Sequence, residues 1–334
     1  MMKNRKYIHT NIIIYVLFLL ISTSCFVSET VINQDTQVHV LGSNHEYKEI
    51  WEFQNKNDFQ ILGSPGKIVI HGYGDGLDIY QMLTIDSVTG NILWSNTNSR
   101  GTKMVIGDNV LYQGTIGKAY IRAFNLDNGE LSWSTKLPSA KSVDIISFAD
   151  DQLLVHTSDS ECFTLDKSGN ILEHFKEDFL LYLLKNNVLY LSTVDGIRAE
   201  KYSTKEMLWF FEIESLYTNP VNDEASLYFA TISNEGHIFS IDLLSGHINW
   251  KASHKLLSNL YITDGKLYFL NNESELVVID KFTGVEVSRV KILPSFALEN
   301  VDENYYISGD STNNILAISF GDNNQIIGLK ILNP

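Results

Sequence analysis

The chain contains a short phrase that recurs at intervals of about 40 residues. In its fullest copy, Asp86 stands four residues before Gly90, and Gly90 stands four residues before Trp94. Both spacings return in two further copies, formed by Asn125, Gly129 and Trp133 and by Asp242, Gly246 and Trp250. A repeat of this length is typical of solenoids and propellers, and the content of each unit decides between them.

Weaker copies fill the gaps between the three complete ones. They keep part of the phrase, namely Asp166 with Gly169, Asp280 with Gly284, and Trp209. Ser288 stands in the Trp position of one copy, and Ile327 stands there in the last. The positions equivalent to Gly90 are 90, 129, 169, 205, 246, 284 and 323, which predicts seven units.

Each unit has the apolar periodicity of strands. Before the Asp position comes a large apolar residue, and before that a small or β-branched one, as in Thr84-Ile85. This alternation places successive side chains on opposite faces of a sheet. A further apolar strand precedes it in every unit, from Lys67–Ile70 in the first to Tyr305–Ile307 in the last. Four short antiparallel strands per unit predict an all-β propeller, most simply with seven blades and alternatively with eight.

At these residues the chain resembles the quinoprotein-type, or pyrroloquinoline-quinone-like (PQQ-like), repeat family. The blade signature of that family runs Ala/Thr-x-Asp-x-x-Thr-Gly-x-x-x-Trp, and Thr84–Trp94 and Ser240–Trp250 are similar to it. The resemblance covers roughly residues 47–334. It implies that the Trp of each outer strand docks against the next blade. We expect this role for four residues, Trp94, Trp133, Trp209 and Trp250.

Trp51 raises the question of how the ring closes. It lies in an alternating segment, Tyr47–Phe53, that no complete unit precedes. Such a lone strand suits a ring in which the first part of the chain completes the last blade. Ile326–Ile331 competes for the same outer position. The pattern favours Trp51 and leaves the choice open.

The N-terminal segment has the features of a targeting signal. Basic residues precede the apolar run Ile12–Ile21, which is shorter than the roughly 20 residues of a bilayer-spanning helix. We therefore expect a signal peptide over residues 1–24. Small residues stand directly before Cys25, in a pattern that resembles the lipobox of bacterial lipoproteins. We expect lipidation at Cys25, with ordinary signal cleavage as the alternative, and a tether over residues 25–46.

The charge of the chain argues against nucleic-acid partners. The full sequence has a net charge of -15, with 25 Lys and Arg against 40 Asp and Glu. Removal of residues 1–24 takes away three basic residues and makes the charge -18. An acidic surface repels phosphate backbones and anionic lipid. We therefore expect a monomer that reaches a membrane through its N-terminal anchor or through a protein partner.

The number and positions of the cysteines indicate whether the chain could bind a quinone cofactor. The chain has two cysteines, Cys25 and Cys162, and Cys162 aligns with apolar residues of the predicted inner strands. The family resemblance implies that true quinoprotein dehydrogenases have adjacent cysteines that form a disulfide over the quinone, and a metal held by acidic and amide side chains. Metalloprotease, hydrolase-elbow and phosphate-loop motifs do not occur in the sequence either. We therefore expect no cofactor and no enzymatic activity.

A few residues remain as weak site candidates. Asp75 and Asp78 could bind Ca²⁺ in the glycine-rich segment His71–Asp78, which a long hairpin loop explains better. His237 and His247 lack the spacing of metal ligands. An acidic cluster, expected to be a solvated loop, comprises Glu173, Glu177 and Asp178.

Two function classes follow from these observations. The first is a non-catalytic scaffold of the cell envelope, which the resemblance to BamB-like lipoproteins implies. Those lipoproteins help to assemble outer-membrane β-barrels, and they present loops and blade edges to an envelope protein partner. The second is a ligand-binding or hydrolytic propeller with carboxylates at the mouth of its channel. Repeat identity supports the fold more strongly than either function.

Overall fold

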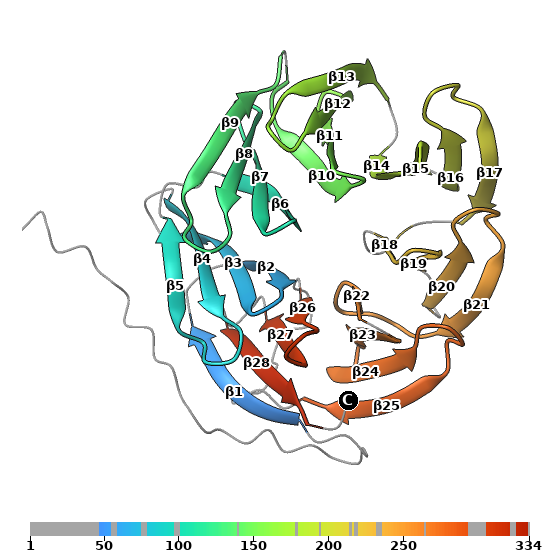
Figure 1. The fold of residues 1–334 in the computed structure, drawn as a ribbon. Coiled ribbons are helices and arrows are strands. Elements are labelled where there is room, and N and C mark those ends of the chain that lie inside the picture. The colour runs from blue at the N-terminus through green and yellow to red at the C-terminus, as the bar shows by residue number, and fades with distance from the viewer. Residues whose placement is uncertain are drawn as a thin grey trace, which may run out of the picture. The chain divides into compact units, whose positions relative to one another are not determined.

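The computed structural model describes residues 47–332 apart from 55–58, 75–78, 97–100, 139, 178–179, 194, 214–215, 217–219, 232–235, 264, 293–304 and 321–324. These residues form seven four-stranded antiparallel sheets, arranged as blades in a ring (Figure 1). The predicted all-β, seven-bladed propeller is confirmed. Residues 1–24, Cys25 and the tether 25–46 lie outside the described part. A search of the described residues finds no helix that is long and apolar enough to cross a membrane.

Each blade runs from a strand beside the ring axis to a strand at the rim. In that order, the strands are β2 (Phe59–Ser64), β3 (Lys67–Gly74), β4 (Ile79–Asp86) and β5 (Ile92–Asn96) in blade 1; β6 (Gly101–Gly107), β7 (Val110–Thr115), β8 (Tyr120–Asn125) and β9 (Leu131–Lys136) in blade 2; β10 (Val143–Ala149), β11 (Gln152–Thr157), β12 (Glu161–Asp166) and β13 (Ile171–Lys176) in blade 3; β14 (Leu180–Lys185), β15 (Val188–Thr193), β16 (Gly196–Lys201) and β17 (Met207–Glu212) in blade 4; β18 (Val221–Asn222), β19 (Ser226–Thr231), β20 (His237–Asp242) and β21 (Ile248–Ser253) in blade 5; β22 (Tyr261–Ile262), β23 (Lys266–Leu270), β24 (Glu275–Asp280) and β25 (Glu286–Lys291) in blade 6; and β26 (Tyr306–Asp310), β27 (Ile315–Phe320), β28 (Gln325–Ile331) and β1 (Tyr47–Gln54) in blade 7.

Blade 7 joins the two ends of the described chain. β1 pairs antiparallel with β28, with Tyr47 opposite Ile331 and Trp51 opposite Gly328. Trp51 therefore lies on the outermost strand, as the sequence favoured. Ile326–Ile331 does not compete for that place, because it forms the neighbouring strand one step further in. Hydrogen bonds between β1 and β28, rather than a turn of the chain, complete the ring.

The sequence-based assignment of the last repeat is wrong by one strand. Tyr306 and Ile307 belong to the innermost strand β26, and Ile327 belongs to the third strand of the blade instead of the Trp-bearing fourth. Position 323 is consequently not an equivalent of Gly90. The reason is physical: β26 and β27 are both almost fully buried, so their apolar runs look alike in sequence.

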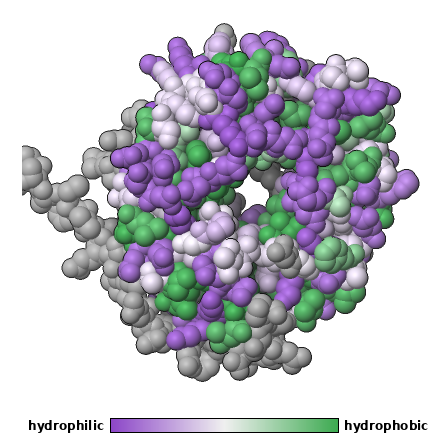
Figure 2. All heavy atoms as spheres, viewed as in Figure 1, coloured by the Kyte–Doolittle hydropathy of each residue, from purple (hydrophilic) through white to green (hydrophobic). Residues whose placement is uncertain are grey.

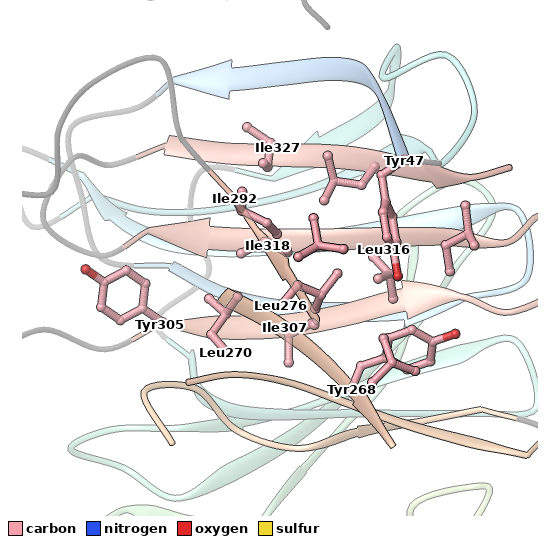
Figure 3. Close-up of a cluster of buried hydrophobic side chains, with 14 of the residues drawn as sticks. Tyr47, Tyr268, Leu270, Leu276, Ile292, Tyr305, Ile307, Leu316, Ile318 and Ile327 are labelled. Carbon is pink, nitrogen blue, oxygen red and sulfur yellow. The ribbon is translucent and has the colours of Figure 1, made fainter. Parts of the chain in front are cut away.

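The core lies between the faces of adjacent blades. The second and third strands are buried on both faces and read as continuous apolar runs, as in β27, whereas the outer strand β5 exposes most of its residues around Trp94. Figure 3 shows one such layer between blades 6 and 7, where Tyr47 and Ile327 face Tyr268 and Leu276. Full burial of an aliphatic side chain contributes about 1.5 to 3 kcal/mol, so these layers are the main source of stability.

The buried carboxyl group of Glu49, on β1, makes the stability of the ring sensitive to pH. The Glu52 carboxylate accepts a hydrogen bond of 2.6 Å from Gln325 Nε2. Burial, and then the charge of Glu52, raise the pKa of Glu49 from 4.5 to about 7. A carboxyl whose pKa is higher in the folded than in the unfolded chain favours folding at low pH. That contribution is lost as the pH rises through about 7.

We therefore expect Glu49→Gln to raise the thermal midpoint at pH 8 and to leave it nearly unchanged at pH 5, where wild-type Glu49 is already protonated. Thermal melts of both proteins at the two pH values would measure this difference. Glu212→Gln, at an exposed position of the rim strand β17, is the matched control. A stabilisation of equal size at both pH values would contradict the assignment to Glu49.

Candidate functional site

The repeated phrase forms the turn between the third and fourth strands of a blade. In blade 1, Asp86 Oδ1 accepts hydrogen bonds from the backbone amides of Val88 and Thr89, at 3.1 and 2.8 Å, and from the Thr89 hydroxyl at 2.9 Å. The Gly90 amide donates to the Asp86 carbonyl at 2.9 Å, and Gly90 has a φ of 72°. The carboxylate thus fixes the turn amides, and glycine supplies the left-handed backbone.

The other turns repeat this arrangement. The side chain at the Asp position accepts from turn amides at Asn125, Asp166, Asp242 and Asp280. Hydrogen bonds lower the pKa of the carboxyl groups, chiefly from the Ser245 hydroxyl for Asp242 and from the Thr283 hydroxyl for Asp280. These side chains thus hold the turn through their hydrogen bonds.

Each tryptophan links its blade to the next one. The indole N–H donates to a carbonyl in the neighbouring turn: Trp51 to Ser87 (2.7 Å), Trp94 to Leu126 (2.8 Å), Trp133 to Lys167 (2.8 Å), Trp209 to Leu243 (3.0 Å) and Trp250 to Lys281 (2.8 Å). All five tryptophans of the sequence make this contact. Trp51 therefore links blade 7 to blade 1 in the same way as the other four tryptophans link their blades to the next one.

The motif glycine has a second function that spans two blades. A Cβ atom on Gly246 would lie 2.6 Å from Trp209 Cδ2, and one on Gly90 would lie 2.7 Å from Trp51 Cβ. The same holds for three further pairs, Gly129 with Trp94, Gly169 with Trp133 and Gly284 with Trp250. Glycine thus leaves room for the tryptophan of the preceding blade. Sequence reasoning found only its role in the turn, because the partner lies in another repeat.

Two blade junctions lack this pair. On blade 3, Glu173 lies opposite Thr164, in the place that Trp133 occupies opposite Ala123 on blade 2. The following turn, on blade 4, has Lys205 with a φ of 56° instead of glycine. Glycine is thus absent where the preceding tryptophan is absent. The second such junction follows Ser288 of blade 6, where blade 7 has no turn between its third and fourth strands because its fourth strand is β1.

Cavities lie at both of these junctions. One of about 220 Å³ separates blades 3 and 4, where the Tyr202 hydroxyl donates to Glu173. The Lys205 ammonium lies 4.6 Å from the centroid of the Phe175 ring and 4.9 Å from that of Tyr202. A second cavity, of about 370 Å³, separates blades 6 and 7. Glu173, in the tryptophan position of blade 3, is one of the residues that line the first cavity.

The seven blades enclose a central channel (Figure 1). Figure 2 shows its opening on one face of the ring. Within it lies a cavity of about 490 Å³. Its walls come from the strands nearest the axis and include Leu62, Val105, Ile146, Phe148, Val221 and Ile262, with Ser147, Asn222 and Ser308 as polar groups. The described residues that line this cavity include no titratable side chain.

Four carboxylates in the turns between the first and second strands of blades 2, 3 and 5 are paired with lysines. Lys167 of blade 3 contacts Asp108 of blade 2 and, at 2.6 Å, Asp151 of its own blade. Two further lysines bind carboxylates of blade 5, Lys281 at 3.0 Å from Asp223 and Lys185 at 2.9 Å from Glu224. These pairs mostly connect adjacent blades. The hydrolytic alternative thus gains no support from these residues.

The structure does not bring the weak site candidates together. Asp75, Asp78 and Asp178 lie outside the described residues. His237 begins β20, with Nδ1 at 3.3 Å from the Ser253 hydroxyl, and His247 lies in a turn. Among the described residues, no group of three His, Cys, Asp or Glu could hold a metal ion. Glu173 lies at the junction of blades 3 and 4, and Glu177 lies 3.6 Å from Arg198 Nη2.

Cys162 is a core residue of β12. It is buried and forms no disulfide within the described part of the chain. Burial, and then the charge of Glu177, raise the pKa of its thiol to about 12. A thiol that stays protonated at neutral pH is a poor nucleophile and a poor metal ligand.

Exposed apolar residues lie just after the third strand of four consecutive blades. Leu244 of blade 5 is 83% exposed and Phe282 of blade 6 is 69% exposed. Leu332, which directly follows β28 of blade 7, and Val88 of blade 1 are also exposed. We call these four residues the apolar tips. Blades 2, 3 and 4 have Asp127, Ser168 and Ser203 at the equivalent turn position. The sequence analysis did not find this difference between the blades. It is visible in the sequence, because the third residue of the motif is apolar in some blades and polar in others.

Known proteins share this architecture. Residues 48–178 match the family model described as outer membrane protein assembly factor BamB. A curated relative, an uncharacterized protein of Rickettsia prowazekii (strain Madrid E), is 22% identical over 287 residues, which cover 77% of this chain and 67% of the relative. The crystal structure of BamB from Moraxella catarrhalis has a TM-score of 0.52 and 12% identity, covering 86% of this chain and 98% of that one.

The similarity to the solved structure is one of fold. Together with the repeated Asp, Gly and Trp of the blades, it agrees with the family model that matches the first three blades. This chain is a seven-bladed β-propeller protein whose residues 48–178 are similar to the BamB family model and whose fold is similar to that of BamB.

Proposed function

We propose that this protein is a non-catalytic scaffold of the cell envelope, which binds another envelope protein through the apolar tips. The single observation that carries the proposal is the grouping of exposed Leu244, Phe282, Leu332 and Val88 on four consecutive blades. Exposed apolar side chains that gather on one part of a surface mark interaction sites more often than scattered ones do. Phe282 is the natural anchor, since aromatic residues are enriched among the residues that dominate binding energy.

The distribution of charged groups also supports a non-catalytic scaffold. Four carboxylates in the turns between first and second strands are paired with lysines, and the cavity within the channel is lined mainly by apolar residues. Nearly every distinctive residue of the motif is explained by packing between blades. The similarity to BamB suggests an envelope setting and a role in assembly. Binding to a partner then requires no chemistry from the propeller itself.

A photo-crosslinking residue placed at position 282 would test the proposal in intact cells. We expect one stoichiometric envelope protein to be captured there and identified by mass spectrometry. The matched control places the same residue at Ser203, the equivalent turn position of blade 4. Equal capture at both positions would refute the assignment of the surface, and no capture from positions 244, 282 or 88 would refute the scaffold.

Attachment to the membrane is a separate part of the proposal. We propose that residues 1–24 are removed on export and that lipid on Cys25 holds the propeller at the outer face of a membrane. Changing Cys25 to Ser should then release soluble protein into the wash fraction, because the propeller surface is acidic and repels anionic lipid. Retention of the variant through salt and carbonate washes would argue for an uncleaved anchor.

A further inference from the structure

The cavity between blades 6 and 7 differs from the channel in its lining. It measures about 370 Å³, which falls within the size range of ligand pockets, roughly 300 to 1,000 Å³. Blade 6 contributes Tyr261, Thr263, Lys266 and Tyr268 to its wall, and blade 7 contributes Ser311, Asn314, Leu316 and Ile331. Figure 3 shows Tyr268, Leu316 and Tyr47 around this region. The wall thus combines one cation with hydroxyl groups, aromatic rings and an apolar floor.

The position of Lys266 explains why this cation lacks a partner. Lys266 begins β23, the second strand of blade 6, just as Lys67 begins β3 in blade 1. Lys67 Nζ lies 2.7 Å from Asp127 Oδ1, in the turn of the next blade. Blade 7 has no such turn, because β28 and β1 are paired but not connected. The Lys266 ammonium consequently has no ion-pair or hydrogen-bond partner in the described part of the chain.

Asp310 lines the same cavity but does not serve as the missing counter-ion. Its Oδ2 atom accepts hydrogen bonds from the Gly66 amide at 2.8 Å, and from the Ser87 hydroxyl and Asn313 Nδ2, both at 2.7 Å. Its Oδ1 atom accepts from the Thr312 amide at 3.0 Å. A carboxylate offers about four lone-pair sites, so these donors occupy it. Its charge is therefore directed to the junction of blades 7 and 1.

We propose that the cavity binds an organic carboxylate with an aromatic or aliphatic body. The ligand carboxylate would take the place that Asp127 has beside Lys67. The hydroxyls of Thr263 and Ser311 and the amide of Asn314 are the polar groups available to fix its orientation. The rings of Tyr261 and Tyr268, with centroids 6.1 Å apart, and the side chain of Leu316 would receive its apolar body.

Two sources could supply such a group, a free small acid or the C-terminal carboxylate of a peptide. Phenylacetate and 2-phenylethanol are probes of the same shape with and without the charge. Acetyl-Ala-Ala-Phe with a free or an amidated C-terminus separates the peptide source from the free acid. Isothermal titration of the propeller with each probe measures the affinity. This site does not depend on the scaffold function, so the crosslinking result and the titration can fail independently.

We expect saturable binding of a carboxylate probe and a loss of about tenfold or more in the Lys266→Met variant, as for a hydrogen bond to a charged group. Lys266→Arg should keep most of the affinity, and Lys67→Met is the matched control that should leave binding unchanged. Tighter binding of the free-acid peptide than of phenylacetate would identify a peptide as the source. Absence of binding by every acid, equal binding of phenylacetate and 2-phenylethanol, or unchanged affinity in Lys266→Met would overturn the proposal.

Discussion

Changing Trp250 to Ala should reduce the free energy of unfolding by about 3 to 5 kcal/mol, as large-to-small changes in protein cores do. The indole is buried against the turn of blade 6, and its N–H donates to the Lys281 carbonyl at 2.8 Å. The change would leave that carbonyl without its donor and open a space against Gly284. Urea unfolding followed by tryptophan fluorescence and circular dichroism would measure the loss.

Ser288 provides the matched control, because it occupies the tryptophan position of the next blade. Ser288→Ala removes no large side chain, so we expect a change of less than about 1 kcal/mol. Equal shifts in the unfolding midpoint for Trp250→Ala and Ser288→Ala would show that the tryptophan does not stabilise the junction.

Changing Asp310 to Ala should cost about 3 to 5 kcal/mol, the size expected when one partner of a buried charged network is removed. Asp310 is buried and connects blade 7 to blade 1 through the Gly66 amide and the Ser87 hydroxyl. Both donors would lose their acceptor, and an unpaired buried polar group is costly. Asp127→Ala, which breaks an exposed pair with Lys67, is the control and should cost less than about 1 kcal/mol.

The pKa of Asp310 predicts how the stability of the propeller changes at low pH. Burial alone would raise the pKa of Asp310, but hydrogen bonds from Ser87, Asn313 and the Gly66 amide outweigh it and hold the pKa below 3.8. A carboxyl whose folded pKa is depressed stabilises the protein above its ordinary pKa. That contribution disappears as the pH falls below 3.8. The difference in stability between wild type and Asp310→Asn should therefore shrink on acidification, and a constant difference would contradict this account.

The fold could be predicted because its signals are local. Asp86 and Gly90 contact each other within one turn, and this contact fixes the spacing that repeats along the chain. A strand pattern followed by such a turn identifies a blade without knowledge of its neighbours. The count of seven is correct, although the strands of the last repeat were assigned one position away from their true places in the blade.

The features that could not be predicted depend on contacts between repeats. The match of Gly246 to Trp209 involves two blades, so neither residue reveals the other in sequence. The register of blade 7 depends on the pairing of β1 with β28, at opposite ends of the chain. The Lys266 cavity likewise arises from a turn that blade 7 lacks. Local periodicity contains no information on these long-range arrangements.

The pairing of β1 with β28 has a consequence for biosynthesis. A ribosome makes the chain from its N-terminus, so β1 emerges first, whereas its partner ends at Ile331. At about 5 to 20 residues per second, that strand waits tens of seconds with unpaired backbone groups. An unpaired strand is prone to association with other chains. The nascent propeller therefore needs protection at its first strand until synthesis of the last blade is complete.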